Sequence, residues 1–408
     1  MVSLVVVAPD VVGSHMAGPG VRAYEIAREM SRHVSVTLAT PNVSDLAVSN
    51  LRVCTYDRKG VTLRNLAGEH DAILVQGFVF HDFPFLKDID KPIIVDIYDP
   101  FVVENLEVHS CRIMPERERM HARDLAALIE QMGIGDFFIC ASEDQRDYWL
   151  GMLGAAGRIN PYNYRSDKSL RKLIDVVPIG LPEEPPQAGE RVLKGVHPGI
   201  SRSDRVLVWG GGLWPWMDPS TIIEAVGQLA PDFEGLRLFF FGKSHPNPRI
   251  SAALGDEYYA QAMKLSRDRG LYNRHVFFSN QWIAYSERHK YLLEADIGIC
   301  LHKELVEMHL SSRTRLLDSI WCGLPILCSK GGHMSDIVEQ HGLGRVVGCG
   351  NVGEVVDALR YMLDVPDLRA RLRSNFARAV EGLTWSKAVA PLVEFLKSPT
   401  KAPDKLTG

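Results

Sequence analysis

Short apolar runs alternate with longer segments of helical periodicity along nearly the whole chain. The first run, at residues 3–8, precedes a glycine-containing loop and a helix predicted to begin at Gly18, with Pro19 at its first turn. Further strands are predicted at residues 34–39, 72–76, 92–98, 136–141 and 174–177, and Ser142 with Gln145 forms a capping-box pattern after the fifth of these six strands. Strands that alternate with helices indicate a parallel α/β sheet.

A second series of the same kind follows a proline-rich polar segment, PIGLPEEPPQ at residues 178–187, which has the composition of a linker. Its strands are predicted at residues 205–209, 236–241, 275–279, 296–301 and 324–328, and its last helices at 352–363, 368–381 and 385–397. The predicted fold class is α/β, with two Rossmann-like domains that face a cleft. In such sheets ligands bind beyond the carboxyl ends of the strands.

The length of 408 residues is too great for one ordinary core and suits two domains of about 150–200 residues each. The predicted boundaries are an N-terminal domain at 1–182, a linker at 183–204 and a C-terminal domain at 205–384. A C-terminal helix and tail at 385–408 are expected to pack back toward the N-terminal domain.

Composition and charge narrow the classes of partner. The net charge of −4 gives no reason to expect nucleic acid. No run approaches the roughly 18 apolar residues of a membrane span, and the apolar start lacks the basic residues and cleavage site of a signal peptide. The seven cysteines are odd in number and show no close metal-ligand pair, which predicts reduced thiols, a cytoplasmic location and no bound metal.

Each predicted domain opens with a strand, a glycine-rich loop and a helix. The loops read APDVVGSHMAGPGVR and WGGGLWPW, and neither has the spacing of a dinucleotide fingerprint or a P-loop. Glycines there let the backbone approach an anion at the helix N-terminus, which suggests roles for Gly18 and Gly20 in the first loop. A tight turn without a ligand is the alternative for either loop. Arg22, early in the first helix, is expected either to meet an anion or to be solvated.

The segment SSRTRLLDSIWCGLPIL, from Ser311 to Leu327, predicts a helix that Ser311 or Ser312 caps. Helical spacing places Arg313 over the apolar stripe, where the helix dipole disfavours a cation by about 0.3–1 kcal/mol. Partial burial without a partner would add to that cost. The sequence therefore predicts an anion beside Arg313, either Glu304 or Glu307 in an ion pair or a bound phosphate, which would accept a bidentate contact.

Three further charged residues are candidates because of their positions. Asp318 lies on the polar side of the same helix, where it could accept hydrogen bonds from two vicinal hydroxyls of a ribose or pair with Arg315. Lys243 follows the strand LRLFFF and could reach the same anion, or be solvated. Asp99 ends the strand of VDIYDP, although Asp-Pro is also a common start of a turn.

The chain resembles the GT-B glycosyltransferases of family 4, which use nucleotide sugars and retain anomeric configuration. The resemblance covers nearly the whole chain, and the order of its motifs carries it. These motifs are GPGVRAYEIAREM, VVPIGLP, VLVWGGGLWPWMDPSTIIEAV, ADIGICLHKE, RTRLLDSIWCGLPIL and GLGRVV.

The resemblance implies that the second domain holds a nucleoside-diphosphate sugar and the first holds a sugar, lipid-linked or small-molecule acceptor. The sugar would be transferred to an acceptor hydroxyl with retention, without a cofactor and without a metal. A lipid-linked acceptor would bring the enzyme to the inner face of the membrane as a peripheral protein. The implied donor-binding residues are Gly211, Gly212, Lys243, Arg313 and Thr314, with Asp318 in the position of a glutamate that binds ribose; Gly18, Gly20 and Arg22 form the implied acceptor or phosphate loop.

The chain departs from the family pattern at two catalytic positions. Leu310 occupies the place of a family glutamate, so Glu307 is the expected replacement. Tyr98 and Asp99 stand where the family often has a histidine, so Asp99 is the expected acceptor-side residue. Two other functions stay open: a non-catalytic or partner-dependent relative of the same fold, which Leu310 would favour, and a sugar-nucleotide epimerase.

Overall fold

The computed structural model describes residues 2–406, apart from the side chains of residues 252–254. The chain forms two compact units. Unit 1 comprises Met1–Gly180 and Trp385–Gly408, and unit 2 comprises Leu181–Thr384. The chain therefore passes from one unit to the other within the motif VVPIGLP, and it returns to unit 1 for its final helices.

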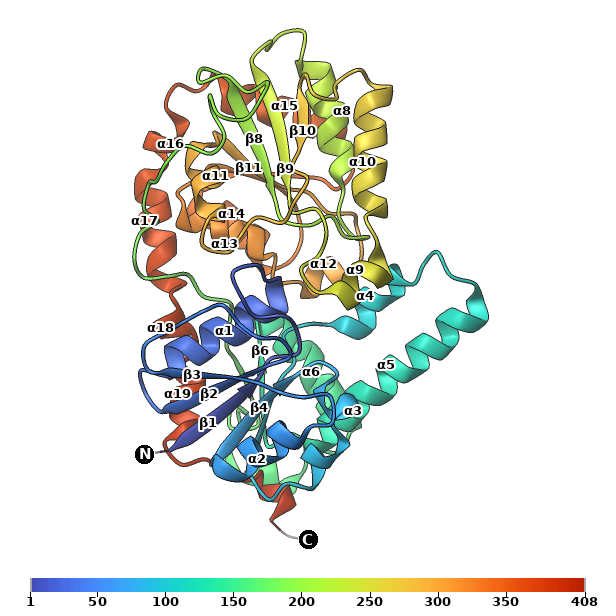
Figure 1. Ribbon diagram of the computed structural model, residues 1–408, viewed down its shortest axis with the longest axis vertical. Helices are drawn as coiled ribbons and strands as arrows, with labels where there is room; N and C mark the ends of the chain where they lie inside the picture. The colour runs from blue at the N-terminus through green and yellow to red at the C-terminus, as the bar shows by residue number, and fades with distance from the viewer. Residues whose placement is uncertain (1, 407–408) are drawn as a thin grey trace. The chain divides into compact units, whose positions relative to one another are not determined.

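Unit 1 contains a parallel sheet of seven strands in the order β3-β2-β1-β4-β5-β6-β7 (Figure 1). The strands are β1 (Ser3–Val7), β2 (Ser35–Thr40), β3 (Leu51–Thr55), β4 (Ala72–Gln76), β5 (Ile93–Asp96), β6 (Phe137–Cys140) and β7 (Ile174–Val176). The helices are α1 (Gly18–Met30), α2 (Val61–Glu69), α3 (Val79–Asp82), η1 (Pro84–Asp88), α4 (Phe101–Val108), α5 (Met114–Ile134), α6 (Glu143–Ala155), α7 (Pro161–Ser166), α18 (Trp385–Ala388), α19 (Ala390–Leu396) and η2 (Pro403–Lys405).

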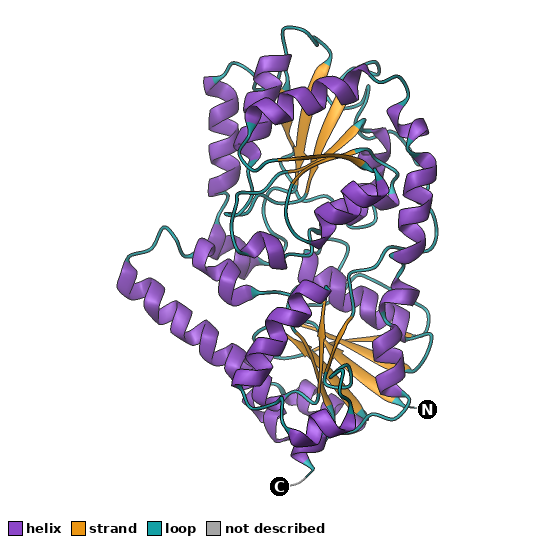
Figure 2. Cartoon of the chain, turned by 180° about the vertical axis from the view of Figure 1, so that it is seen from behind, coloured by secondary structure: helices purple, strands orange, loops and turns teal. Residues whose placement is uncertain are grey.

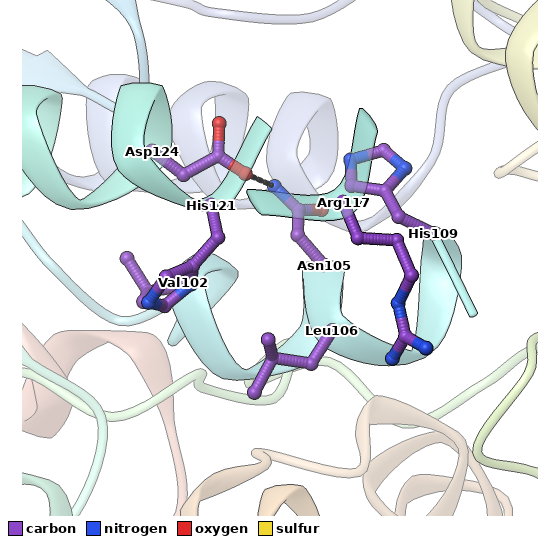
Figure 3. A pocket seen from close by; sticks show the side chains of 7 residues that line it. All are labelled: Val102, Asn105, Leu106, His109, Arg117, His121 and Asp124. Atoms are coloured by element: carbon purple, nitrogen blue, oxygen red, sulfur yellow. Dashed lines mark hydrogen bonds between the residues drawn. The ribbon is translucent and has the colours of Figure 1, made fainter. Parts of the chain in front are cut away.

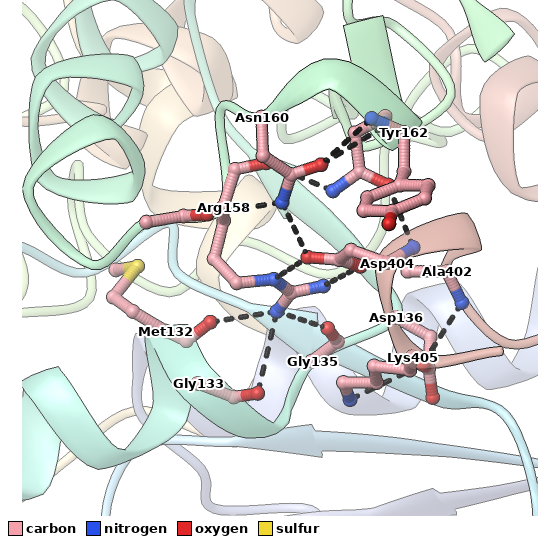
Figure 4. A network of polar contacts seen from close by, with 12 residues as sticks. Met132, Gly133, Gly135, Asp136, Arg158, Asn160, Tyr162, Ala402, Asp404 and Lys405 are labelled. Carbon is pink, nitrogen blue, oxygen red and sulfur yellow. Dashed lines mark hydrogen bonds and ion pairs between the residues drawn. The ribbon is translucent and has the colours of Figure 1, made fainter. Parts of the chain in front are cut away.

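The end of the chain is part of unit 1 through apolar and charged contacts. Phe395 stacks on Phe137 of β6 with 4.7 Å between ring centroids. Arg158 donates to both carboxylate oxygens of Asp404, at 2.7 and 3.1 Å, and to backbone carbonyls at the end of α5 (Figure 4). The side chains of Arg158 and Asp404 are only 6% and 11% exposed, so each charge depends on the other for its stability in the interior.

Unit 2 contains a parallel sheet of six strands in the order β10-β9-β8-β11-β12-β13. The strands are β8 (Arg205–Gly210), β9 (Leu236–Phe241), β10 (Val276–Phe278), β11 (Ile297–Cys300), β12 (Ile326–Ser329) and β13 (Gly344–Val347). The helices are α8 (Pro219–Leu229), α9 (Pro248–Leu254), α10 (Glu257–Asp268), α11 (Arg288–Glu294), α12 (Glu307–Leu310), α13 (Thr314–Trp321), α14 (His333–His341), α15 (Val352–Asp364), α16 (Leu368–Arg371) and α17 (Arg373–Gly382).

Each face of the unit 2 sheet has its own apolar layer, because successive side chains of a strand point to opposite faces. Leu207 and Trp209 of β8 pack with residues of α8, α10 and α15 on one face. Val206 and Val208 pack on the other face with residues of α11 and the end of α13. Helices cover both faces of the strands in each unit (Figure 2). Both sheets are thus doubly wound, and in each the order of strands reverses beside the first strand, β1 or β8.

The elements follow the predicted order, with informative differences. The strands β3 and β13 were not among those predicted from the apolar runs; each lies at the edge of its sheet, and they bury only Leu51 and only Val347, so their apolar patterns are weak. The helix predicted at 385–397 is two helices, with a break at Val389 just before Pro391. The capping box is confirmed, because Ser142 Oγ accepts a hydrogen bond from the Gln145 N–H at 3.1 Å.

Candidate functional site

Two glycines bring the ends of β8 and β9 into direct backbone contact in unit 2. Gly211 has a φ of +94° and Gly242 a φ of +109°. A Cβ on Gly242 would lie 2.5 Å from the Gly211 carbonyl carbon, so no larger residue fits without moving this backbone. Lys243 follows at once, half-buried and with no hydrogen bond or ion pair among the described residues. The structure therefore brings together three predicted donor-binding residues, Gly211, Gly212 and Lys243.

Arg315 binds the backbone of the glycine-rich loop. Its Nε and Nη2 donate to the carbonyl oxygens of Gly210 and Gly212. The Gly212 N–H has no hydrogen-bond partner among the described residues. Sequence reasoning considered Arg315 only as a partner of Asp318. Its carbonyl partners are more than 100 residues away, so helical spacing could not have identified them.

Arg313 is the N-cap of α13 and has a left-handed backbone, with φ 34° and ψ 59°. The prediction that Ser311 or Ser312 caps this helix is wrong, because no side chain makes a capping hydrogen bond. A left-handed conformation is uncommon for a residue with a Cβ and costs about 1–3 kcal/mol, so the surrounding structure must impose it. Thr314, another predicted donor-binding residue, is the first residue of the helix and is half-buried.

The Arg313 side chain is 5% exposed, and only part of its hydrogen-bonding capacity is used. Its Nη1 donates to the Ser329 carbonyl at the end of β12, at 2.7 Å. Its Nε and Nη2, like the Oγ atoms of Ser311 and Ser312, are buried with no hydrogen-bond partner in the described part of the chain. The described ion pairs include none between Arg313 and Glu304 or Glu307. Arg313 Nε and Nη2 therefore keep unused hydrogen-bonding capacity, and a bound phosphate beside them stays a prediction.

Glu307 begins α12 and is 2% exposed. Its Oε2 lies 3.9 Å from Nδ1 of His302, which follows β11. Burial, together with Arg313 and Arg315, lowers the pKa of His302 well below its ordinary value, so the imidazole is neutral at physiological pH. Leu310, at the other end of α12, is 8% exposed and belongs to the core. Glu307 is therefore the carboxylate of this short helix, and its charge acts on Arg315.

Asp318 lies in the second turn of α13, where its Oδ1 is 2.8 Å from Nη2 of Arg288. The ion pair is thus with Arg288, and the predicted alternative partner, Arg315, affects Asp318 only through its charge. The Arg288 guanidinium also stacks over the Tyr285 ring, with 4.1 Å to the ring centroid. Both charged side chains are about one-fifth exposed, so a hydroxyl-bearing ligand could still compete for the carboxylate.

The predicted first-domain loop has a different electrostatic arrangement. Arg22 is fully buried in α1, and its Nε and Nη2 donate to the two carboxylate oxygens of Asp96 at 2.6 and 2.9 Å. The guanidinium lies 4.7 Å from the centroid of the Tyr98 ring. Arg22 is thus neither solvated, as one alternative predicted, nor a free cation. Sequence reasoning missed Asp96, although a carboxylate at the end of the apolar run IIVD was a visible signal.

Gly18 and Gly20 shape the same loop. Gly18 is the first residue of α1, and a Cβ there would lie 3.9 Å from the Tyr98 hydroxyl. A Cβ on Gly20 would lie 2.2 Å from the Val11 carbonyl, so glycine is needed for the close contact between α1 and the loop before it. This contact explains Gly20 without a ligand.

Asp99 follows the end of β5 and is half-buried. Burial and the nearby Asp96 raise the pKa of Asp99 to about 6, although a hydrogen bond to Glu104 opposes the shift. A carboxyl group that titrates near neutral pH can exchange a proton with a substrate hydroxyl. The predicted catalytic role of Asp99 has this chemical basis.

A small pocket in unit 1 lies between α4 and α5 (Figure 3). Asn105, His109, His121 and Asp124 contribute to its lining, and Asn105 donates to Asp124 at 2.7 Å. Its volume of about 10 Å³ has room for roughly one water molecule, and none of the predicted site residues lines it. Among the described residues no group of three or more His, Cys, Asp or Glu side chains could hold a metal ion. No helix between residues 2 and 406 is long and apolar enough to cross a bilayer.

Comparison with known proteins connects these features to a class of enzymes. Residues 198–378, which include β8, β9 and α13, match the family model described as "Glycosyl transferases group 1". A search of curated proteins finds no match.

Solved structures resemble nearly the whole chain at low sequence identity. Sucrose-phosphate synthase from Thermosynechococcus elongatus has a TM-score of 0.68 and 12% identity, over 97% of this chain and 98% of that one. Anabaena HepE in complex with UDP-glucose has a TM-score of 0.64 and 13% identity, over 97% and 100%. WaaG, a glycosyltransferase involved in lipopolysaccharide biosynthesis, has a TM-score of 0.60 and 14% identity, over 98% and 100%. The predicted fold class is confirmed: the chain has the two Rossmann-like α/β units of the GT-B glycosyltransferase fold, and the match to the glycosyltransferase group 1 model lies in unit 2.

Proposed function

We propose that the protein is a glycosyltransferase that moves a sugar from a nucleoside-diphosphate sugar to an acceptor hydroxyl, with retention of configuration and without a metal ion. The observation that carries this proposal is the Arg313 side chain, a buried guanidinium with two nitrogen atoms that lack a hydrogen-bond partner in the described structure. Such a cation is costly unless an anion binds beside it. A diphosphate supplies both charge and acceptor oxygens.

The groups around Arg313 match the needs of a diphosphate. The Gly212 N–H, the N-terminus of α13 and the hydroxyls of Ser311 and Ser312 offer hydrogen-bond donors, and Lys243 supplies a second cation after β9. Amide groups at a helix N-terminus favour an anion. Arg315 fixes the loop that presents Gly212, so little reorganisation is needed when the ligand arrives. The match of residues 198–378 to a glycosyltransferase model supports the same assignment.

The proposed reaction breaks the bond between the sugar anomeric carbon and the diphosphate, whose oxygen leaves with the electron pair. The acceptor oxygen forms the new bond to the anomeric carbon and gives its proton to the Asp99 carboxylate. Arg313 and Lys243 stabilise the negative charge that grows on the leaving phosphate, which is the task that a metal performs in other enzymes. Asp318 contacts the ribose. Glu307 contacts the donor sugar, as the replacement for the family glutamate that is missing at Leu310. Asp99 is the catalytic residue on the acceptor side.

The class of acceptor and the cellular location belong to the same proposal. The acceptor is a sugar, a small molecule or a lipid-linked molecule, and the enzyme works in the cytoplasm, with peripheral membrane contact if the acceptor is lipid-linked. HepE binds UDP-glucose in a solved complex, and that similar fold supports a nucleotide-sugar donor for this chain.

The decisive experiment measures nucleotide binding by wild type and by Arg313→Met. Thermal unfolding is followed with UDP, GDP, ADP and TDP, because a ligand that binds the folded state raises the melting temperature. At least one nucleotide should stabilise the wild type, and Arg313→Met should bind it about 10- to 100-fold more weakly, as expected for a lost charge-assisted hydrogen bond. Transfer should retain configuration by NMR and persist in EDTA.

The matched control is Arg369→Met. Arg369 is also an arginine of unit 2, but it donates to backbone carbonyls that include those of Gly323 and Leu293, so it is satisfied within the protein. Its loss should lower stability and leave nucleotide affinity unchanged. No nucleotide effect on the wild type would refute the transferase proposal. Nucleotide binding without transfer or hydrolysis of any nucleotide sugar would favour the non-catalytic relative that Leu310 allows.

A further inference from the structure

An aromatic cluster lies beside the proposed diphosphate site in unit 2. Trp214 and Trp216 stack with 6.2 Å between ring centroids and an interplanar angle of 25°. His245 lies 5.6 Å from Trp214 and 5.6 Å from Trp282, so the rings form a continuous row. They come from the loops that follow β8, β9 and β10, and all four are half-buried. Aromatic side chains at the carboxyl ends of three parallel strands lie where this kind of sheet binds ligands.

The Trp214 ring is in contact with the glycine-rich loop. A Cβ on Gly212 would lie 3.1 Å from Cζ2 of Trp214, so the ring covers the same residue whose N–H is available to a phosphate. No hydrogen bond within the described part of the chain uses the Nε1–H of Trp214 or Trp216. Trp321, by contrast, donates from Nε1 to the Glu184 carbonyl at 2.9 Å. Trp214 and Trp216 therefore offer an apolar face together with an N–H donor.

The loop that carries these rings is held firmly. Lys303 donates from its backbone N–H to the Trp216 carbonyl at 2.9 Å and from Nζ to the Pro215 carbonyl at 2.6 Å. Asp218 donates from its N–H to the Leu301 carbonyl at 3.0 Å. These contacts join the loop after β8 to the loop after β11. The rings thus have a fixed position before any ligand binds, which lowers the entropy cost of stacking.

The two sides of the glycine-rich loop have different chemistry. Asp318, the proposed ribose contact, pairs with Arg288 of α11 and so belongs to the face of the sheet that α11 and α13 cover. Trp214 and Trp216 pack against the apolar layer of the opposite face, which α8, α10 and α15 cover. A diphosphate between Gly212 and Arg313 would therefore have the nucleoside on one side and the aromatic rings on the other. The group attached to the other end of the diphosphate is the sugar.

We propose that Trp214 and Trp216 bind the sugar ring of the donor, with the apolar C–H face of a pyranose stacked on the indole rings and its hydroxyls accepting from Nε1. This inference rests on the proposed function and assigns the part of the donor that the Trp pair recognises. Residues 210–218 of this loop contain no lysine or arginine, and the guanidinium groups of Arg313 and Arg315 supply positive charge from α13. The loop after β8 is thereby free to select the sugar.

The test compares each nucleoside diphosphate with its sugar conjugate. Calorimetric affinities are measured for UDP and UDP-glucose, GDP and GDP-mannose, ADP and ADP-glucose, and TDP and TDP-glucose, and the pair that binds is retained. Trp214→Ala and Trp216→Ala should each lower the affinity for the sugar conjugate by about 5- to 10-fold, as expected for a lost aromatic contact. The affinity for the nucleoside diphosphate should stay within about 2-fold of the wild-type value. Trp214→Phe keeps a ring without the N–H and should fall between Ala and wild type.

Trp321→Ala is the matched control, since Trp321 is a half-buried tryptophan of the α13 side. It should leave the affinity ratio of conjugate to nucleoside diphosphate unchanged. Retained binding of the nucleoside diphosphate also shows that each variant is folded. An unchanged ratio in the Trp214 and Trp216 variants would overturn the inference, as would equal weakening of both ligands, which would place the base there, or an effect confined to the acceptor KM. Absence of any nucleotide binding by the wild type would instead refute the proposed function.

Discussion

Arg22 in unit 1 and Arg313 in unit 2 occupy comparable places and have opposite electrostatic surroundings. Both are nearly or fully buried, and both lie near the start of a helix at the carboxyl edge of a parallel sheet. Arg22 makes a bidentate ion pair with Asp96, so its charge is compensated inside the fold. The Arg313 side chain makes one hydrogen bond, to a backbone carbonyl, and no ion pair of the described residues includes it. The first arginine is neutralised within the fold, and the second keeps two nitrogen atoms without a hydrogen-bond partner, which the proposed function assigns to a bound anion.

The comparison separates two reasons for burying a cation. A paired buried charge contributes to the stability of the unit, and removal of one partner leaves the other buried without a counterion. An unsatisfied buried charge lowers stability and is tolerated where function requires it, as the left-handed backbone at Arg313 also indicates. The two units therefore differ at this position: the unit 1 arginine has an internal carboxylate as counterion, and the proposal assigns the unit 2 arginine to a ligand.

The largest expected effect follows from removal of Asp96. Asp96→Ala leaves the Arg22 guanidinium buried without a counterion, so unit 1 should lose about 3–5 kcal/mol of stability. Because the two units can unfold separately, hydrogen–deuterium exchange of peptides from β4 to β6 is the appropriate measurement.

The control for Asp96→Ala is Glu69→Ala, which breaks the exposed pair of Glu69 with Arg52, whose side chains are 57% and 62% exposed. Exposed pairs contribute less than about 1 kcal/mol, so exchange in unit 1 should hardly change. If Asp96→Ala behaved like this control, the claim that unit 1 depends on the Arg22 pair would be wrong.

The contrast between the arginines also marks the limit of sequence-based prediction. Apolar runs located most strands of both units, because a strand buried on both faces has a local signature. The edge strand β3 lacks that signature and was missed. Helical spacing placed Arg313 over the buried face, as observed, but it could not show that Asp96 neutralises Arg22 from 74 residues away.

Within the candidate site, the sequence identified residues better than it identified their partners. Lys243 was predicted from its position after a strand and Gly211 from the family resemblance, and the structure places them at adjoining strand ends, where Gly242 contacts Gly211. For Asp318, predicted to bind ribose, helical spacing offered Arg315 as the alternative partner, yet its ion pair is with Arg288, from another helix. Arg315 instead binds carbonyls of the loop after β8. Such partners depend on tertiary packing, which periodicity does not encode.

A smaller effect is expected when inorganic pyrophosphate is added in EDTA. It should stabilise unit 2 of the wild type by about 2.7 kcal/mol at a concentration of 100 times its Kd, because it binds only the folded site. Arg313→Met should lose most of this gain while having similar or higher stability without the anion, since an uncompensated buried cation has been removed. Hydrogen–deuterium exchange of peptides from β11 to α13 measures both the stabilisation by pyrophosphate and the stability without it.

Two comparisons make the pyrophosphate experiment specific. Arg369→Met should keep the full gain, because its guanidinium is already satisfied by backbone carbonyls. Peptides of α1 and β5 should show no added protection from exchange, because the Arg22 guanidinium is already paired with the Asp96 carboxylate. Protection centred on unit 1, or equal protection in wild type and Arg313→Met, would contradict the assignment of the anion site to Arg313.

The smallest expected effect concerns the carboxyl group of Asp99 beside the closed pair of unit 1. The pKa of Asp99 is about 6 in the folded protein and 3.8 in an unfolded chain, so the folded state binds this proton more tightly. Stability should therefore fall as pH rises from about 4 to 6, and the full cost applies above pH 6. Asp99→Asn removes the ionised form and should raise the stability of unit 1 by about 1–2 kcal/mol at pH 8, less than the roughly 3 kcal/mol equivalent to the whole shift because the side chain is only half-buried. Urea unfolding at pH 3 and pH 8 measures the difference, which should nearly vanish at pH 3, below both pKa values, where the folded carboxyl is protonated and the unfolded one mostly so. A gain in stability of equal size at both pH values would show that the substitution acts through packing. It would then contradict the electrostatic effect of burial and Asp96 on the Asp99 carboxyl.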